Sequence, residues 1–233
     1  MFTQDRKVVV IIPAYNEQDS IGLVIKQVLQ YHCTVLVIDD GSSDQTGSAA
    51  AKAGAEVISL PQNLGIGGAV QTGYLFAFRH GYDIAVQVDA DGQHKPRELH
   101  KILQPLLDGE ADLALGSRYI AKTSFKSSFS RRTGMILLSL LVTMLTGQRI
   151  YDTTSGFRAA NRKVIELFAH EYSTDYPEVD ALVLARKNGM RIKEVSVEMD
   201  QRCAGESSIT PFRSAYYVTK VILALLVRSL RSV

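Results

Sequence analysis

Apolar and polar positions along the chain follow two alternating patterns. Short apolar runs, of the kind found in strands covered on both faces, are each followed by a longer stretch with helical periodicity. The pattern predicts strands at 7–12, 35–38, 57–60, 84–88 and 112–115 and helices at 19–30, 43–53, 65–78 and 96–107. Repeated units of this length predict an α/β fold, with an open, mostly parallel sheet and helices on both faces.

Polar segments follow three of these strands, at the sheet edge where ligands bind in open α/β folds. The first strand leads into 13–17, the second into 39–44 and the fourth into 89–93. Each segment alone fits an ordinary turn, because Asp, Asn, Ser and Gly favour turns for local reasons. Three such segments on one edge of one sheet predict a binding site there.

Two carboxylates, Asp89 and Asp91, come at the end of the fourth strand. Side chains at i and i+2 of an extended chain point the same way, and a divalent cation usually compensates such paired charges. With the amide of Gln93, these oxygen ligands fit Mg²⁺ or Mn²⁺ that also holds substrate phosphates. The alternative is a polar turn in which one Asp caps the helix that begins near Pro96.

Three glycines, Gly65, Gly67 and Gly68, open the third predicted helix. Their spacing is a weak dinucleotide-binding signal, because no acid ends a strand about twenty residues later, as that fingerprint requires. We therefore expect these glycines to let the helix pack closely beside a nucleotide.

The composition is that of one large globular domain. The chain has 233 residues, of which 46% are hydrophobic and 21% charged, and its formal net charge of +2 gives no support for nucleic-acid binding. The two cysteines, Cys33 and Cys203, form no disulfide framework and fit a reducing compartment. The N-terminus lacks a signal-peptide pattern, and no apolar run reaches the roughly 18 to 20 residues of a membrane span. These features predict a soluble, cytoplasmic protein.

The stretch 118–149 contains basic residues and no acidic one. Within it, 135–145 is apolar almost all round, and a second apolar stretch with basic residues covers 216–230. Both stretches fit core or dimer-interface helices. Both also fit interfacial helices that rest on an anionic membrane leaflet and hold a lipid phosphate. The second interpretation predicts peripheral attachment to the inner face of the cell membrane, or a membrane-protein partner.

Seven motifs occur in the order in which they occur in family-2 glycosyltransferases of the GT-A fold, which has a Rossmann-like sheet. They are VVVIIPAYNEQDSI, VLVIDDGSSDQT, NLGIGGAVQTGYLFAFRHGYD, VQVDADGQH, GSR, DTTSGFRAANR and RCAGESSI. Within that family the chain is most similar to the dolichol- and polyprenyl-phosphate sugar transferases. The resemblance implies a single GT-A domain over 1–210, followed over 211–233 by an amphipathic helix that packs on the domain or at a membrane surface.

The resemblance also implies a donor site at the three strand ends. Seven residues match the family's pocket for the nucleotide-sugar: Pro13, Tyr15, Glu17, Ile38, Asp40, Asp89 and Ala90. Three residues match the site of the metal and the diphosphate: Asp89, Asp91 and Gln93.

Further roles follow from the later motifs. Arg118 matches an arginine that reaches the phosphates, and Asp152 an acid beside the acceptor. Arg202 and Ser207 match a segment that folds over the bound substrates. Loss of the sugar leaves charge on the departing diphosphate, which a metal and Arg118 would stabilise. Attack in one step from the opposite face would invert the anomeric centre, as the resemblance implies.

Two classes of acceptor remain open. A hydroxyl of a lipid-linked glycan needs a base, for which Asp152 is the first candidate and Asp180 the second. The YPEVDAL stretch at 176–182 loosely resembles enzymes of that class. A polyprenyl phosphate is already anionic near pH 7, and Arg131 and Arg132 at the start of the apolar helix would bind it. We favour the phosphate.

The nucleotide (UDP, GDP or dTDP), the sugar and the oligomeric state remain open, and a homo-oligomer fits the sequence. A catalytically inactive, nucleotide-sugar-binding subunit is a third interpretation. Intact acids at Asp89, Asp91 and Asp152, together with Arg118, count against it.

Overall fold

A computed structural model describes residues 6–120, 129–174 and 177–200, with side chains in the helix that begins at Phe129 described from residue 136 onward. Seven strands form one sheet in the order β3-β2-β1-β4-β6-β5-β7. The strands are β1 (Val8–Ala14), β2 (Thr34–Asp39), β3 (Glu56–Ser59), β4 (Ile84–Gln87), β5 (Leu113–Ser117), β6 (Arg158–Asn161) and β7 (Ile192–Ser196). Only β6 runs antiparallel to its neighbours in this sheet, so the predicted mostly parallel sheet is confirmed.

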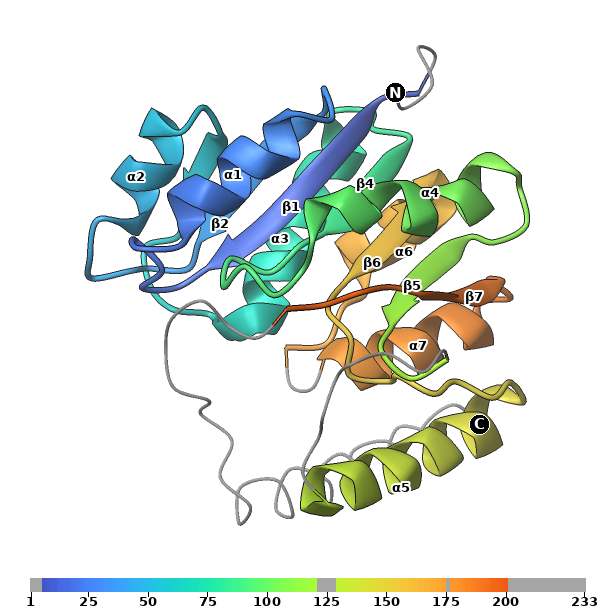
Figure 1. Ribbon diagram of the computed structural model, residues 1–233. Helices are drawn as coiled ribbons and strands as arrows, with labels where there is room; N and C mark the ends of the chain where they lie inside the picture. The colour runs from blue at the N-terminus through green and yellow to red at the C-terminus, as the bar shows by residue number, and fades with distance from the viewer. Residues whose placement is uncertain (1–5, 121–128, 175–176, 201–233) are drawn as a thin grey trace.

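Helices cover both faces of the sheet, as Figure 1 shows. They are α1 (Ile21–Leu29), α2 (Thr46–Lys52), α3 (Gly65–Arg79), η1 (Pro96–Glu98), α4 (Leu99–Leu107), α5 (Phe129–Thr146), α6 (Arg162–His170) and α7 (Pro177–Lys187). Side chains of β1 alternate between the two faces, so that Val9 and Ile11 join one core and Val8, Val10 and Ile12 the other. The first core is covered by α3, α5, α6 and α7, and the second by α1, α2 and α4.

The predicted element boundaries shift where polar side chains redirect the chain. The helix predicted at 43–53 begins only at Thr46, because the preceding segment bonds to the turn after β1. In that turn the Asn16 side chain accepts the N–H of Ser43 at 2.9 Å, and the Asn16 N–H donates to Ser42 Oγ at 2.9 Å. The helix predicted at 96–107 begins as the 3₁₀ turn η1 before it becomes α4. The hydrogen bonds between Asn16 and the segment 42–43 hold the ends of β1 and β2 together.

The apolar stretch 135–145 lies in α5, which is buried on one side only. Leu138, Leu141 and Val142 are buried in the core, where α5 packs on α7. The opposite side exposes Leu140 and Met144, among other large apolar residues, by 55% and 75%. Core packing therefore accounts for one side of the described part of this helix. Within the described residues, no helix combines the length and hydrophobicity that a membrane span requires.

Candidate active site

The ends of β2, β1 and β4 lie side by side, because these three strands are neighbours and run parallel. Their following segments line a cavity of about 350 Å³. It brings together residues that lie far apart in sequence and were predicted to share a site: Pro13, Tyr15, Glu17, Asp40, Asp89, Ala90 and Asp91. The convergence expected of the polar segments is thus present in the structure.

Two hydrogen bonds hold Asp40 between β1 and the start of α3. Its backbone N–H donates to the Ala14 carbonyl at 2.9 Å, and its Oδ1 accepts the N–H of Leu64 at 2.7 Å. Tyr15, directly after β1, lines the same cavity with 49% of its surface exposed. A buried acid and an exposed aromatic ring therefore meet in the crevice between two parallel strands.

The loop that carries Asp89 and Asp91 is tightened by its own side chains. The Asp89 N–H donates to Nδ1 of His94 at 3.0 Å, and the His94 ring stacks on Phe157 with centroids 4.9 Å apart. Asp91 Oδ1 accepts the N–H of Gln93 at 3.0 Å. The pair is thus fixed by backbone and ring contacts, and Gln93 lies on the same turn but does not line the cavity.

Gly156 of the DTTSGF motif lies against the Asp89 carboxylate. A Cβ at this position would lie 2.9 Å from Asp89 Oδ1 and 3.1 Å from Asp89 Oδ2. Real side chains do not tolerate such contacts, so glycine lets the motif approach the acid. Across the residues that the structure describes, no three His, Cys, Asp or Glu side chains form a cluster able to hold a metal ion. The described residues therefore offer a carboxylate pair at this place.

Arg118 follows β5 and forms a buried ion pair with Asp152. Its Nε donates to Asp152 Oδ2 at 2.7 Å, its Nη2 donates to Oδ1 at 2.7 Å, and its backbone N–H donates to Oδ2 at 3.0 Å. Burial alone would lower the pKa of Arg118, but the hydrogen bonds and the charge of Asp152 outweigh it and raise the pKa. The charge of Asp89 acts in the same direction. Asp152 is thus the main partner of the Arg118 charge, and Asp89 adds a smaller effect.

Glu178 lines the cavity and was missed by the sequence analysis. It lies near the start of α7, and burial raises the pKa of its carboxyl, with the positive charge of Arg158 opposing this and the charge of Asp89 adding to it. Other residues that line the cavity without having been predicted are Ala14, Asn63, Ile66 and Ala69, and Gly65, one of the glycines expected beside a nucleotide, lines it as well. The resemblance of the YPEVDAL stretch to other glycosyltransferases was a signal for Glu178.

Of the glycines at the start of α3, Gly67 lies closely against another segment of the chain, whereas a Cβ on Gly65 would meet nothing within 4 Å. A Cβ on Gly67 would lie 2.3 Å from the Ser173 carbonyl oxygen and 2.7 Å from Thr174 Cα. The backbone of α3 thus touches the chain just before α7. This contact sets the first turn of α3, and with it Ile66 and Ala69, against the cavity.

Several predicted residues lie away from the cavity or outside the described residues. Ile38 is fully buried in β2 and Asp180 is buried in α7, and neither lines the cavity. Arg131 and Arg132 lie near the start of α5, but their side chains are outside the described part. Arg202 and Ser207, like the predicted helix over 211–233, also lie outside the described residues.

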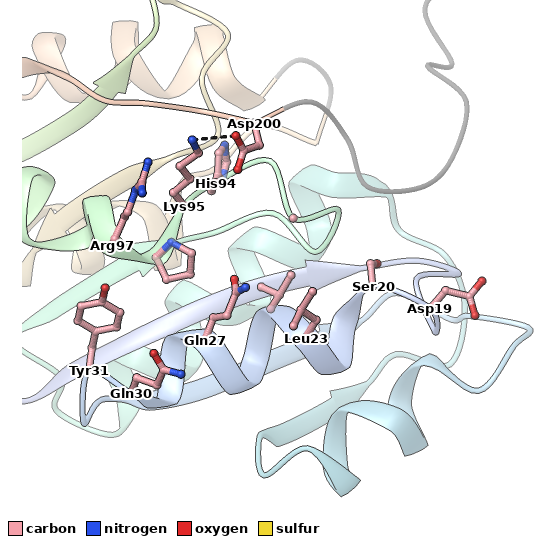
Figure 2. A pocket seen from close by; sticks show the side chains of 13 residues that line it. Asp19, Ser20, Leu23, Gln27, Gln30, Tyr31, His94, Lys95, Arg97 and Asp200 are labelled. Carbon is pink, nitrogen blue, oxygen red and sulfur yellow. Dashed lines mark ion pairs between the residues drawn. The ribbon is translucent and has the colours of Figure 1, made fainter.

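A second, larger cavity of about 580 Å³ lies between α1 and the chain around η1. Figure 2 shows Leu23 and Gln27 of α1 facing Lys95, whose ammonium lies 2.8 Å from Asp200. Of the predicted site residues, none lines this cavity. The predicted donor-site residues therefore gather at the smaller cavity, where the acids and the strand ends meet.

Comparison with known proteins gives a family. A family model described as "Glycosyl transferase family 2" matches residues 9–168. The chain is 33% identical over 220 residues to polyprenol monophosphomannose synthase of Mycolicibacterium smegmatis, covering 88% of this chain and 82% of that protein. It is 31% identical over 215 residues to UDP-N-acetylglucosamine–dolichyl-phosphate N-acetylglucosaminyltransferase of Methanococcus voltae, covering 83% and 86%.

The fold is shared with a solved glycosyltransferase. Glucosyl-3-phosphoglycerate synthase from Mycobacterium tuberculosis, in complex with Mn²⁺, UDP and phosphoglyceric acid, superposes with a TM-score of 0.74 at 24% identity. The match covers 96% of this chain and 78% of that one. The predicted GT-A fold is thereby confirmed.

Proposed function

Because the chain belongs to glycosyl transferase family 2, we propose that it transfers a sugar from a nucleotide-sugar to a polyprenyl phosphate, with inversion. The observation that carries this proposal is the shared cavity of Asp40, Tyr15, Asp89 and Asp91 at adjacent strand ends. Relatives named for sugar transfer to dolichyl or undecaprenyl phosphate support the acceptor class.

The donor would bind with its nucleoside in the crevice between β1 and β2. Tyr15 offers an exposed ring to the base, and the Asp40 carboxylate offers an acceptor to the base or the ribose. The diphosphate would then extend toward β4 and reach Asp89 and Asp91. This path follows the cavity along adjacent strand ends.

The carboxylate pair fits a hard divalent cation. Asp89 and Asp91 would supply oxygen ligands only, and two protein ligands would leave coordination positions to the diphosphate and water, as Mg²⁺ and Mn²⁺ commonly require. Such an ion would supply Lewis-acid stabilisation of the departing diphosphate. The Mn²⁺ and UDP bound by the M. tuberculosis synthase support this assignment.

Arg118 would stabilise the same leaving group from the β5 side. Its charge lies in a buried setting, where electrostatic interactions are stronger than in water, and it is coupled to Asp89. The acceptor would attack the anomeric carbon from the opposite side of the sugar. One displacement of this kind inverts the configuration at that carbon.

A phosphate acceptor fits the ion pair of Asp152 better than a hydroxyl does. A hydroxyl needs a base, but both oxygens of Asp152 already accept hydrogen bonds from Arg118. A polyprenyl phosphate brings its own negative charge. Its lipid tail would meet the exposed apolar side of α5, and Arg131 and Arg132 near the start of that helix would bind its headgroup.

The test is a matrix of donors and acceptors. UDP-, GDP- and dTDP-sugars are each incubated with Mn²⁺ and undecaprenyl phosphate, and the sugar-lipid product is measured. We expect one donor to give product, and the double variant Arg131→Ala/Arg132→Ala to raise the KM of the lipid with little change for the donor. Product formed with a hydroxyl acceptor, and none with undecaprenyl phosphate, would contradict the proposal.

A further inference from the structure

The carboxylate of Glu194 accepts two hydrogen bonds from the turn that carries Asp152. Glu194 lies on β7, where the parallel register pairs it with Leu115 of β5. Its Oε2 accepts the N–H of Tyr151 at 2.8 Å and its Oε1 accepts the N–H of Asp152 at 2.8 Å. A hydrogen bond from Ser117 reaches the same carboxylate. Three separate segments therefore meet at one half-buried acid.

The turn held in this way presents Asp152 to Arg118. Asp152 has no exposed surface and contacts Arg118 through both oxygens, while Thr154 Oγ1 accepts a further bond from Arg118 Nη2 at 3.2 Å. An arginine side chain on its own has many rotamers, and this arrangement selects one of them. To act as a base, Asp152 would have to give up part of a buried ion pair.

The same segment continues to the carboxylate pair. Four residues after Asp152, Gly156 lies so near the Asp89 carboxylate that an added Cβ would come within 2.9 Å of Asp89 Oδ1. The segment from Asp152 to Gly156 therefore fixes Arg118 at its first residue and borders Asp89, the acid proposed to bind the cation, at its last. A shift of the turn would displace Arg118 relative to Asp89.

We propose that Glu194 and Asp152 are positioning residues, which hold Arg118 where negative charge develops on the leaving diphosphate. This inference rests on the proposed function and assigns Asp152 a role other than that of a base. Preorganised charges stabilise a transition state because they need no rearrangement during the reaction. The supporting groups of such a site must fix its geometry closely for the charge to act.

Kinetics of Glu194→Gln test the proposal. Glutamine keeps the size of the side chain but replaces one accepting oxygen by a donor that faces a backbone N–H. We expect kcat to fall by about ten- to a hundredfold, the range typical of residues that orient a ligand, with the KM of the donor little changed. The matched control is Glu198→Gln, which removes an exposed acid that pairs with Arg97, and it should keep full activity.

A double-mutant cycle separates positioning from a general loss of structure. If Glu194 acts through Arg118, Glu194→Gln should cost little in an Arg118→Lys background, since lysine cannot form the bidentate pair. An undiminished effect of Glu194→Gln in that background would overturn the proposal. Full kcat in Glu194→Gln alone would overturn it as well.

The pH profile tests the role of Asp152. If Asp152 is a positioning residue, Asp152→Asn should lower kcat/KM by a similar factor at every pH and leave the shape of the pH profile unchanged. If Asp152 is a base, the fall of kcat/KM at acidic pH that the wild type shows should disappear in the variant. The second result would assign Asp152 to proton transfer and overturn its positioning role.

Arginine side-chain NMR keeps the inference distinct from the proposed function. The Arg118 Nε–H signal is assigned by its loss in Arg118→Lys, and in the wild type it should exchange slowly with solvent. Glu194→Gln should accelerate that exchange, whereas Glu198→Gln should not. Unchanged exchange in Glu194→Gln overturns the positioning claim, even if wild-type protein turns over no nucleotide-sugar and the proposed function fails.

Discussion

Asp91 is the more buried acid of the pair, and the N–H of Gln93 fixes one of its oxygens. Asp91→Asn keeps this acceptor but removes the charge that a cation needs. We expect Mn²⁺-dependent turnover to fall by at least about a hundredfold, because charge on the leaving group loses its stabilisation. Asp108→Asn, at an exposed helix end, is the control. Wild-type activity that persists in excess chelator would contradict the metal assignment.

The charge of Asp40 can be tested separately from its structural bond. Asp40→Asn keeps an oxygen for the N–H of Leu64 but loses the negative charge in the crevice. We expect the affinity for the free nucleoside diphosphate to weaken by about 1.5 to 3 kcal/mol, as for a lost hydrogen bond to a charged group. Calorimetry measures the change, and thermal unfolding checks that the fold persists. An unchanged Kd would place the nucleotide elsewhere.

At the scale of elements, the contact of α3 with the chain before α7 should decide how well the cavity is formed. Gly67→Ala drives a methyl group into the Ser173 and Thr174 backbone, and overpacking of this kind typically costs about 1–3 kcal/mol. Gly22→Ala is the control, since nothing lies within 4 Å of its Cβ and the helix should gain about 0.5–1 kcal/mol. In thermal unfolding, Gly67→Ala should melt below the wild type and Gly22→Ala above it. Nucleotide affinity should fall only in Gly67→Ala.

Asp112 joins the start of β5 to the neighbouring strands. It accepts hydrogen bonds from Arg191 and from Asn161, and those from Arg191 are the main cause that lowers the pKa of Asp112 to about 2. A depressed pKa means that this stabilisation is present above the unfolded pKa of 3.8 and is lost as pH falls toward 2.

The Asp112→Asn variant tests this linkage. We expect it to unfold at lower urea concentration than the wild type at pH 7, with the difference shrinking as pH drops below about 4. Glu110→Gln, which removes an exposed partner of Lys193, is the control. A difference that stays constant down to pH 3 would show that the charge of Asp112 is not what stabilises the fold.

The first half of the fold could be predicted because its strands are apolar runs that end in acids. Residues Val8–Ala14 are buried throughout, and the site residues follow directly from the strand order. The strand β6 (Arg158–Asn161) escaped prediction because it begins with a fully buried arginine and ends with an asparagine, which leaves only two apolar residues. The strand β7 escaped it because Lys193 and Glu194 hide its apolar pattern. Glu194 could not be assigned a role, since its partners are backbone groups of another segment.

At the scale of the whole molecule, α5 carries an exposed apolar surface that is separate from the proposed donor site. Leu137, Leu140 and Met144 are exposed on α5, and Figure 1 shows α5 and α1 at opposite ends of the molecule. If this side rests on a membrane, the triple change of these residues to Gln should weaken binding to anionic phospholipid vesicles by about tenfold or more, because buried apolar area drives such binding.

Vesicle co-sedimentation measures this effect. Leu23→Gln is the control, because Leu23 is 58% exposed on α1 and should not contribute. Equal binding of the triple variant and the wild type would mean that α5 does not face the lipid. Unchanged thermal unfolding would show that the lost binding is not a loss of fold.

The insertion of β6 between β4 and β5 governs the order in which this protein can assemble. Asp89 ends the β4 segment, but the motif that borders it and the pair that fixes Arg118 come from residues after 150. Closing such distant contacts is slow, because chain entropy is lost before the contacts form. During synthesis the crevice between β1 and β2, where we propose that the nucleoside binds, can therefore form early, whereas the ion pair of Arg118 stays incomplete until β7 has emerged from the ribosome.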